Sequence, residues 1–332
     1  MGLAHPRAGS DNAGMVRVEP EQIERFADFF QSNQSVKAFD FCGVQEGVLF
    51  PSRGQPGVID YFFFCTAHQF GFWHLAGDRY DRPMIATLDG VAYKGSDYIW
   101  RAATRRWLTD PTWFEPARLA QAGDADLERL FTDDTGTNPL PMWDANLRII
   151  HAYASWFVSG RTSPVELVAE ANAAPRSLEA FLRRAGQVPG YCEDTLQKKL
   201  QLLAVILENR PEHFLRVTDP DSYRPIIDYH LQRSALRTGL VSIKDAGLLA
   251  RLEARVLVSR EEERVIRLAV FDAIAQLVEK SGASVAAIDY FFFMNRTRCP
   301  EMTEPKCPEC PVRDICVRAT RLFQPVLRTT DY

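Results

Sequence analysis

Near its end the chain contains the stretch Cys299-Pro-Glu-Met-Thr-Glu-Pro-Lys-Cys307-Pro-Glu-Cys310-Pro-Val-Arg-Asp-Ile-Cys316, which holds four cysteines in eighteen residues. Their spacing is Cys-x7-Cys-x2-Cys-x5-Cys, and the prolines beside them restrict the backbone of the loop. Four thiolates from one short loop suit a metal centre, which would be a [4Fe–4S] cluster or a tetrahedral zinc ion. Zinc sites usually use two Cys-x2-Cys pairs, and here there is one. We therefore predict a [4Fe–4S] cluster, with zinc as the alternative.

The composition is that of a soluble globular protein, with 46% hydrophobic and 25% charged residues among 332. The apolar runs are too short for a membrane span. No signal peptide is evident, so we expect a reducing, cytoplasmic compartment, in which disulfides between these cysteines are disfavoured. The formal net charge of −4 argues against a surface that coats nucleic acid broadly. The remaining three thiols are expected to be buried: Cys42, Cys65 and Cys192.

Periodicity predicts a mostly α protein with a small β element near its N-terminus. Helical spacing covers residues 19–31, whereas the aromatic run 58–74 is expected to form one or two strands. The Asp-Gly pair within residues 84–93 predicts a hairpin, followed by a helix with Ser96 as its N-cap. We divide the chain into four parts: a disordered leader (1–18, with Met15 as an alternative start to Met1), an α/β region (19–124), a helical domain (125–297) and the cysteine loop with its tail (298–332).

Three later helices have clear end signals. Pro225 is expected to open a helix that Gly239 closes. Ser259 and Glu262 form a capping box for residues 260–280, and residues 284–297 form the last helix before the cysteine loop.

Asp228 is the candidate catalytic residue, because the predicted helix places this carboxylate in its first turn among apolar neighbours. The N–H groups at a helix N-terminus stabilise an anion there. The alternative is that Asp228 only stabilises the helix.

Both motifs resemble the endonuclease III family of base-excision glycosylases. The cysteine loop of that family has the same spacing except in the first gap, which holds six residues there and seven here. The family's Val-Asp-Thr-His-x-x-Arg motif is similar to Ile227-Asp228-Tyr229-His230-Leu231-Gln232-Arg233. The resemblance implies a DNA-glycosylase-like helical fold, a structural [4Fe–4S] cluster and Asp228 as the catalytic carboxylate. The family's Gly-rich hairpin, which grips a DNA phosphate, is missing, because there is no glycine between Gly190 and Gly239.

A second resemblance, to the queuosine salvage proteins, covers more of the chain. It rests on FFFCTAHQFGFW (62–73), ATLDGVAYKGSDYIWRA (86–102), DLERLF (126–131), the Asp228 motif and Ile288-Asp289-Tyr290-Phe291-Phe292-Phe293-Met294. His230 and Met294 replace the family's arginine and aspartate. This resemblance implies hydrolysis of the N-glycosidic bond of a nucleotide such as queuosine 5′-phosphate, to release a 7-deazapurine base. The expected partner is then a small-molecule nucleotide rather than nucleic acid or a membrane.

Other site residues follow from this hypothesis. Asp289 is the expected second carboxylate, and aromatic rings would sandwich a planar base. Lys198 and Lys199 would hold a phosphate or form a Schiff base, unless they are only the solvated start of a helix. The substrate-binding candidates are Asp289, Tyr229, His230, Tyr290, Phe72, Trp73, Lys198 and Lys199, with core packing as the alternative for the aromatic residues. The alternative functions are a DNA base-excision glycosylase and a non-catalytic binder of nucleotides or nucleic acid.

Overall fold

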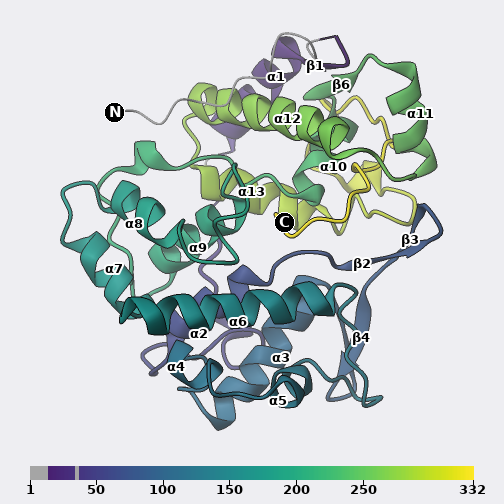
Figure 1. Ribbon diagram of the computed structural model, residues 1–332. Coiled ribbons are helices and arrows are strands. Elements are labelled where there is room, and N and C mark those ends of the chain that lie inside the picture. The colour runs from purple at the N-terminus through teal and green to yellow at the C-terminus, as the bar shows by residue number, and fades with distance from the viewer. Residues whose placement is uncertain (1–13, 34–36) are drawn as a thin grey trace. The chain divides into compact units, whose positions relative to one another are not determined.

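The protein is described by a computed structural model covering residues 14–33 and 37–332 (Figure 1). The described part is mostly α: it contains thirteen α-helices, and its strands form three two-stranded sheets. This confirms the predicted fold class. The chain divides into two compact units, each drawn from separate stretches of sequence. No helix in the described part has both the length and the apolar composition needed to cross a membrane.

The first unit takes the described residues up to Phe39, together with Leu75–Asp81 and Arg224–Arg328. Its two-stranded antiparallel sheet pairs β1 with β6, with Val16 opposite Ile243. The elements are β1 (Val16–Val18), α1 (Pro20–Ser32), α10 (Tyr229–Thr238), β6 (Val241–Ile243), α11 (Ala246–Ala254), α12 (Arg260–Ser281), α13 (Val285–Asn295) and the short 3₁₀ helix η3 (Cys307–Glu309).

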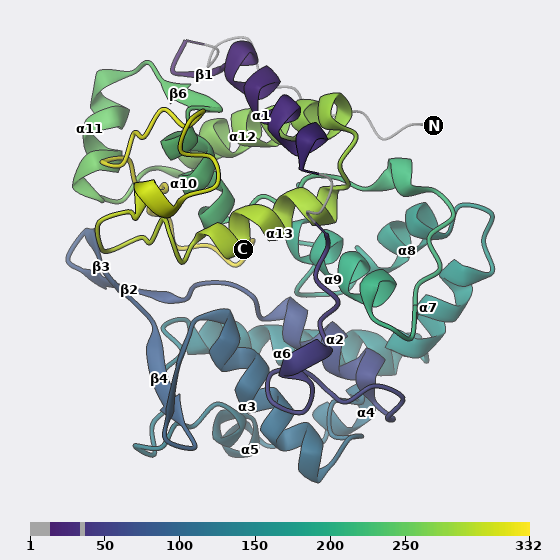
Figure 2. The same ribbon diagram turned by 180° about the vertical axis from the view of Figure 1, so that it is seen from behind.

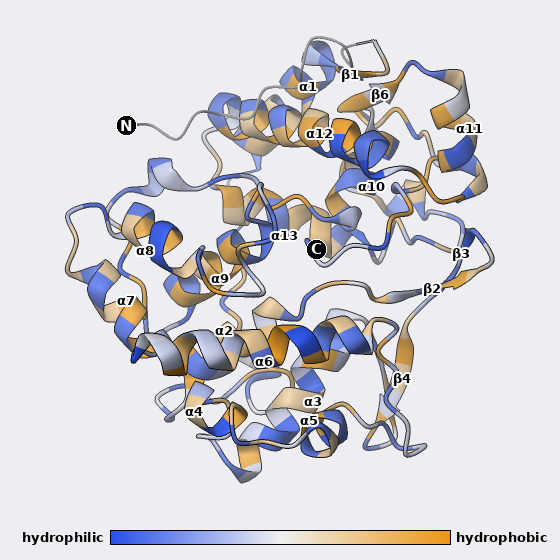
Figure 3. Cartoon of the chain, in the orientation of Figure 1, coloured by the Kyte–Doolittle hydropathy of each residue, from blue (hydrophilic) through white to orange (hydrophobic). Residues whose placement is uncertain are grey.

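Aromatic packing between α1 and α13 forms part of the core of the first unit. Phe26 stacks against Phe292 with ring centroids 6.2 Å apart, and Phe30 meets Phe291 edge-on at 5.0 Å. Phe26 and Phe30 are buried, as the helical spacing of residues 19–31 predicts, and Phe292 is buried as well. Figure 3 shows hydrophobic and hydrophilic residues alternating along α12, the pattern of an amphipathic helix.

The capping box of α12 is confirmed. The Ser259 side chain accepts from the Glu262 backbone N–H, and the Glu262 carboxylate accepts from the Ser259 N–H at 2.8 Å. Gly282 ends the helix in the left-handed region, with φ +68°. The predicted leader is only partly testable, since residues 1–13 lie outside the described residues. Its last part is corrected, because Val16–Val18 forms β1 and pairs with β6.

The second unit is Asp40–His74, Arg82–Tyr223 and Thr329–Tyr332. This division cuts across the boundaries expected from the sequence, because composition along the chain does not show which distant segments pack together. The helical elements are η1 (Gly43–Gln45), α2 (Val58–Ala67), α3 (Ser96–Thr109), α4 (Pro116–Leu119), α5 (Asp124–Leu130), α6 (Trp143–Gly160), α7 (Pro164–Asn172), α8 (Ser177–Ala185), α9 (Lys198–Asn209) and η2 (Pro220–Ser222). The strands β4 (Ile85–Leu88) and β5 (Val91–Lys94) pair within this unit. The strands β2 (Trp73–Ala76) and β3 (Arg79–Pro83) also pair with each other, and each has residues in both units.

The aromatic run 58–74 does not form the predicted strands. Val58–Ala67 is the helix α2, and only Trp73 begins a strand. Every residue of α2 except Ile59 is buried, since α2 packs against α3, α7 and α9. A helix that is buried on nearly all sides has no polar face, so periodicity does not distinguish it from a buried strand.

The Asp-Gly hairpin is confirmed by the antiparallel pairing of β4 with β5, with Leu88 opposite Val91. Asp89 and Gly90 both have positive φ, 54° and 77°, as a two-residue hairpin turn requires. The helix after the hairpin begins as expected, but its N-cap is Gly95 instead of Ser96.

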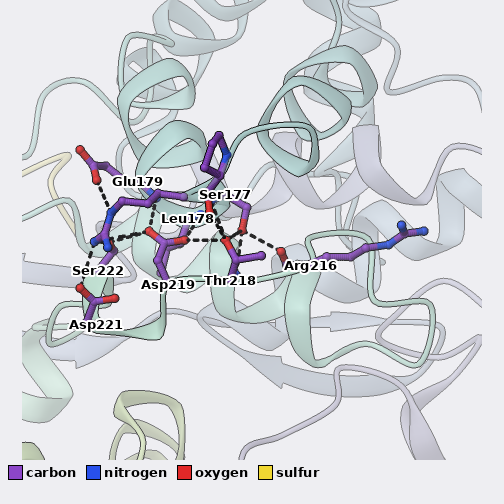
Figure 4. Close-up of polar contacts among 10 residues, drawn as sticks. Ser177, Leu178, Glu179, Arg216, Thr218, Asp219, Asp221 and Ser222 are labelled. Carbon is purple, nitrogen blue, oxygen red and sulfur yellow. Dashed lines mark hydrogen bonds and ion pairs between the residues drawn. The ribbon is translucent and has the colours of Figure 1, made fainter.

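The N-terminus of α8 is capped by a carboxylate that is distant in sequence (Figure 4). Asp219 accepts hydrogen bonds from the backbone N–H of Leu178 at 2.8 Å and of Glu179 at 3.1 Å. Ser222 Oγ donates to the same carboxylate at 2.7 Å, and Asp219 is only 3% exposed. Burial raises the pKa of Asp219, but these hydrogen bonds outweigh it, so the pKa is lower than that of a free aspartate.

We predict that Asp219→Ala lowers the free energy of unfolding by about 2 kcal/mol, because two N–H groups of α8 lose their acceptor. Because the folded-state pKa is depressed, the carboxylate contributes its full stability above pH ~4 and loses it as the pH falls through the folded-state value. Thermal melts at pH 7 and at pH 3 measure both effects. Asp221→Ala, which removes a carboxylate whose side chain is 69% exposed, is the matched control. Equal melting temperatures for the two variants would contradict the capping role.

Candidate functional site

The four cysteines of the C-terminal loop line one hollow in the first unit, where the loop lies beside α10 and α13 (Figure 2). All seven cysteines of the chain lie in the described residues, and none is in a disulfide. Within those residues, no three Cys, His, Asp or Glu side chains are close enough together to hold a single metal ion. The thiols therefore surround a common space without converging on one point. The four are Cys299, Cys307, Cys310 and Cys316.

Three of these sulfur atoms accept N–H hydrogen bonds from nearby groups. Arg237 Nη1 donates to Cys299 Sγ at 3.4 Å, and Asn295 Nδ2 donates to Cys310 Sγ at 3.5 Å. The backbone N–H of Arg318 donates to Cys316 Sγ at 3.3 Å. Such donors stabilise metal-bound thiolates and tune the centre that they hold. The residues present therefore fit a thiolate-bound metal centre.

Burial raises the pKa of Cys316, and the charges of the other three cysteines raise it further. Several thiolates in one half-buried loop repel each other unless a cation compensates their charge. A metal centre supplies that compensation and holds its ligating thiols deprotonated.

The C-terminal end of α10 is joined to the cysteine loop. Arg237 Nη1 donates to Pro300 O at 2.7 Å, and its Nε donates to Leu322 O at 2.8 Å. The backbone N–H of Val317 bonds Thr238 O, so the loop satisfies a carbonyl at the end of the helix. Gly239 closes α10 as predicted, with φ +83°, and a Cβ there would lie 2.4 Å from the Val317 side chain. The close approach of the loop thus requires glycine.

Asp228 is the N-cap of α10, one position before the helix. The predicted helix from Pro225 is corrected: residues 225–227 are not helical, because α10 begins at Tyr229. Asp228 Oδ1 accepts from the Leu231 backbone N–H at 2.9 Å, which fixes the orientation of the carboxylate. Asp228 is half-buried, and the buried Arg267 holds the preceding turn by donating to Ile227 O at 3.1 Å.

A buried network connects the Asp228 end of α10 with the cysteine loop. Arg233 Nη1 lies 3.5 Å from Glu301 Oε2, and Arg233 Nη2 is 2.9 Å from His230 Nδ1. Tyr80 OH donates to Glu301 Oε1 at 3.0 Å, and burial together with the Glu301 charge raises the pKa of Tyr80. Glu301 follows Cys299 by two positions, so the loop contacts α10 through Arg233 as well as Arg237.

Aromatic candidates from the sequence lie where α10 meets α13. The Tyr229 and His230 rings are 4.2 Å apart, and His230 lies 6.2 Å from the Phe293 ring of α13. Tyr290 stacks on Phe39 at 5.2 Å with parallel planes. Asp289, the candidate second carboxylate, is half-buried on the same helix.

The other four candidates belong to the second unit. Phe72 and Trp73 are 5% exposed and pack in its core. Lys198 and Lys199, at the start of α9, are buried, so the solvated helix start considered for them is wrong. Lys199 Nζ donates to Ala67 O at 3.0 Å, and burial lowers the pKa of Lys199 to about 8.

The N-terminus of α9 is already occupied by a carboxylate of the chain. Asp194 accepts from the backbone N–H groups of Leu196 at 3.0 Å and Lys198 at 2.7 Å, and it is 4% exposed. These are the donors that a helix N-terminus would offer to a phosphate. The Asp194 carboxylate therefore occupies the position at the N-terminus of α9 that the phosphate of a ligand would need.

Arg233, Arg237 and Glu301 had no predicted role at the site, although Arg233 belongs to the aspartate motif. A signal was present, because Arg233 and Arg237 are four residues apart and therefore on the same face of α10. Both are at most 4% exposed, which is rare for arginine without a partner. The partner carboxylate, Glu301, is separated from them by more than sixty residues, and no local pattern indicates that contact.

Comparison with known proteins found no family model that matches the chain and no matching curated protein. The queuosine salvage family thus has no support from these comparisons. Among solved structures, the chain is similar to a trapped covalent intermediate of endonuclease III with DNA, an estranged-adenine complex. The sequence identity is 12% and the TM-score 0.46, and the likeness covers 91% of this chain and 97% of that one. A likeness of this degree assigns neither a family nor an activity.

Proposed function

We propose that the chain is an N-glycosylase of the endonuclease III type, which breaks the bond between a base and its sugar with Asp228 as the catalytic carboxylate. The observation that carries this proposal concerns α10. The helix has Asp228 at its beginning, and Arg237 near its end donates to the thiol of Cys299. The aspartate motif and the cysteine motif, which are far apart in sequence, are thus joined by one ten-residue helix.

Cleavage of an N-glycosidic bond develops positive charge on the sugar, as in other glycoside hydrolysis. A carboxylate beside that sugar stabilises the charge and takes a proton from the attacking water. The hydrogen bond from Leu231 already orients the Asp228 carboxylate, so the group needs little reorganisation during the reaction. The neighbouring rings of Tyr229 and His230 offer stacking surfaces for a planar base.

Cys299, Cys307, Cys310 and Cys316 would hold a [4Fe–4S] cluster, which we propose for a structural role. A cluster distributes its thiolates over separate irons, whereas zinc needs all four sulfur atoms about 2.3 Å from one centre. The single Cys-x2-Cys pair with two outlying cysteines supports the cluster over zinc, because zinc sites usually use two such pairs. When the cluster is bound and the loop is ordered, the contacts of Arg237 and Glu301 would hold α10 in a fixed position, and α10 in turn positions Asp228.

For the substrate we propose first a damaged or modified base in DNA. His230 and Arg233 stand where the endonuclease III motif has its histidine and arginine, and these two side chains are hydrogen-bonded to each other. The second candidate is release of a queuine-like 7-deazapurine base from a free nucleotide such as queuosine 5′-phosphate. It is favoured by the missing Gly-rich hairpin: there is no glycine between Gly190 and Gly239, so a turn that grips a DNA phosphate is poorly served.

The test is base release by anaerobically purified protein, measured by mass spectrometry. Duplex oligonucleotides carrying damaged bases would be offered beside queuosine 5′-phosphate. We expect a free base and an abasic site in the DNA. Release of free queuine while the DNA stays intact would reject DNA as the substrate and support queuosine 5′-phosphate instead. Stable binding without base release from any substrate would contradict the proposed activity, and it is the result expected for a non-catalytic binder.

A further inference from the structure

A hollow of about 580 Å³ lies within the second unit. It is lined by residues of α3, α4, α5 and the loop that follows α3; the three helices are labelled in Figure 1. Four arginines line it, whereas the chain as a whole has a net charge of −4. Its volume is within the range of sites that bind small molecules. The four arginines are Arg105, Arg106, Arg118 and Arg129.

The carboxylates near this hollow are too few to neutralise its arginines. Arg118 makes a two-pronged ion pair with Asp110, both contacts at 2.7 Å, and Arg106 shares the same carboxylate at 3.7 Å. Two guanidinium groups therefore share one negative charge. Arg105 lies 3.8 Å from Asp89, and it shares this carboxylate with Arg101, which does not line the hollow.

Arg129 pairs with Asp126, and the Glu115 carboxylate adds a weaker attraction to Arg118, so these pairs leave about one positive charge without compensation. In the described residues, Arg106 Nε is in addition a buried donor without an acceptor. The lining thus has an excess of positive charge that an anionic ligand would compensate.

The same lining offers an apolar surface. Trp113 is 8% exposed, and the Arg106 guanidinium lies over its ring, 5.2 Å from the centroid. Leu130 and Ala102 add further apolar contacts. A guanidinium held on an aromatic face has a fixed orientation, which favours two-pronged recognition of phosphate oxygens.

We propose that this hollow, the arginine pocket, binds a small organic molecule that carries a diphosphate group, of the size of a nucleoside diphosphate. The excess of positive charge favours a multiply charged anion such as a diphosphate, and the apolar lining matches an organic remainder. The proposal does not depend on the glycosylase activity, because all lining residues belong to the second unit and none is a proposed catalytic residue. A nucleic-acid backbone would instead favour an extended basic surface over a concave one.

The test is calorimetric titration of the full-length protein with ADP, inorganic pyrophosphate, adenosine and citrate. We expect ADP to bind at least about tenfold more tightly than citrate, and adenosine without phosphate to bind at least about tenfold more weakly than ADP. The affinity for ADP should fall as salt is added. Absence of ADP binding at millimolar concentration, or equal affinity for citrate, would overturn the proposal.

Arg106→Gln should weaken ADP binding by about tenfold or more, since it removes a shared charge and a donor. Arg129→Gln, at a side chain that is 70% exposed, should weaken it without any risk to the core. The matched control is Arg184→Gln on α8, which likewise removes an arginine with one carboxylate partner but lies outside the pocket. If both pocket variants bind ADP like the control, the site is wrong. If a twelve-nucleotide single strand binds more tightly than ADP through the same two arginines, the pocket is a nucleic-acid contact and the small-ligand assignment is wrong.

Discussion

Asp228→Asn should fold normally and release base about 10²-fold more slowly than the unsubstituted protein, or slower still. Asparagine is nearly as good an N-cap as aspartate, so α10 keeps its hydrogen bond from Leu231. The amide has no negative charge to stabilise the sugar cation and accepts no proton from water. The loss should therefore be in the rate of the chemical step, measured by single-turnover base release.

Asp245→Asn provides the matched control for this prediction. Asp245 is the N-cap of α11 in the same unit and accepts from the Leu248 N–H at 2.6 Å. Both variants should have the melting temperature of the unsubstituted protein, and only Asp228→Asn should lose activity. Full activity in Asp228→Asn would remove the central claim about the site. Equal losses in both variants would show that the effect comes from general destabilisation.

Cys310→Ser should lose the metal centre and much of the stability of the first unit together. The thiol is one of four around the hollow, and it accepts a hydrogen bond from Asn295 at the end of α13. A structural metal centre contributes its binding free energy to folding, so its loss lowers the melting temperature by roughly several degrees or more. Iron and acid-labile sulfide content, visible absorbance and a thermal melt measure the two effects.

Cys192→Ser is the control for Cys310→Ser, because Cys192 lies outside the loop. Its thiol was expected to be buried, as those of Cys42 and Cys65 are, but the structure places Cys192 at the surface. The control should keep its iron, its colour and its stability. A Cys310→Ser protein with full iron content and an unchanged melting temperature would refute the metal assignment. Stoichiometric zinc in place of iron and sulfide in the unsubstituted protein would select the alternative metal.

Local signals in the sequence were sufficient for several elements. The capping box at Ser259, the Asp-Gly turn at Asp89 and the C-cap at Gly239 are confirmed, because each depends on residues within a few positions of one another. The helix α2 could not be recognised in this way. Its residues have β-prone side chains, and its helical state results from burial among three other helices.

The candidate site was predictable only in part. The cysteines and Asp228 carry local motifs, and the structure places both motifs in one unit. The contacts of Arg237 with Cys299 and of Arg233 with Glu301 join residues more than sixty positions apart, and no sequence period reports such contacts. The four arginines of the arginine pocket come from three helices, α3, α4 and α5, and they form a set only after folding.

The pairing of β1 with β6 has a consequence for the order in which the protein folds during synthesis. Val16 is among the first described residues, but its partner Ile243 is made more than 200 residues later. The second unit, apart from its last four residues, is complete once Tyr223 has been added. Domains generally fold as units as they emerge from the ribosome. We therefore expect the central part of the chain to fold first, whereas β1 can pair only after the sequence that carries Asp228 has been made.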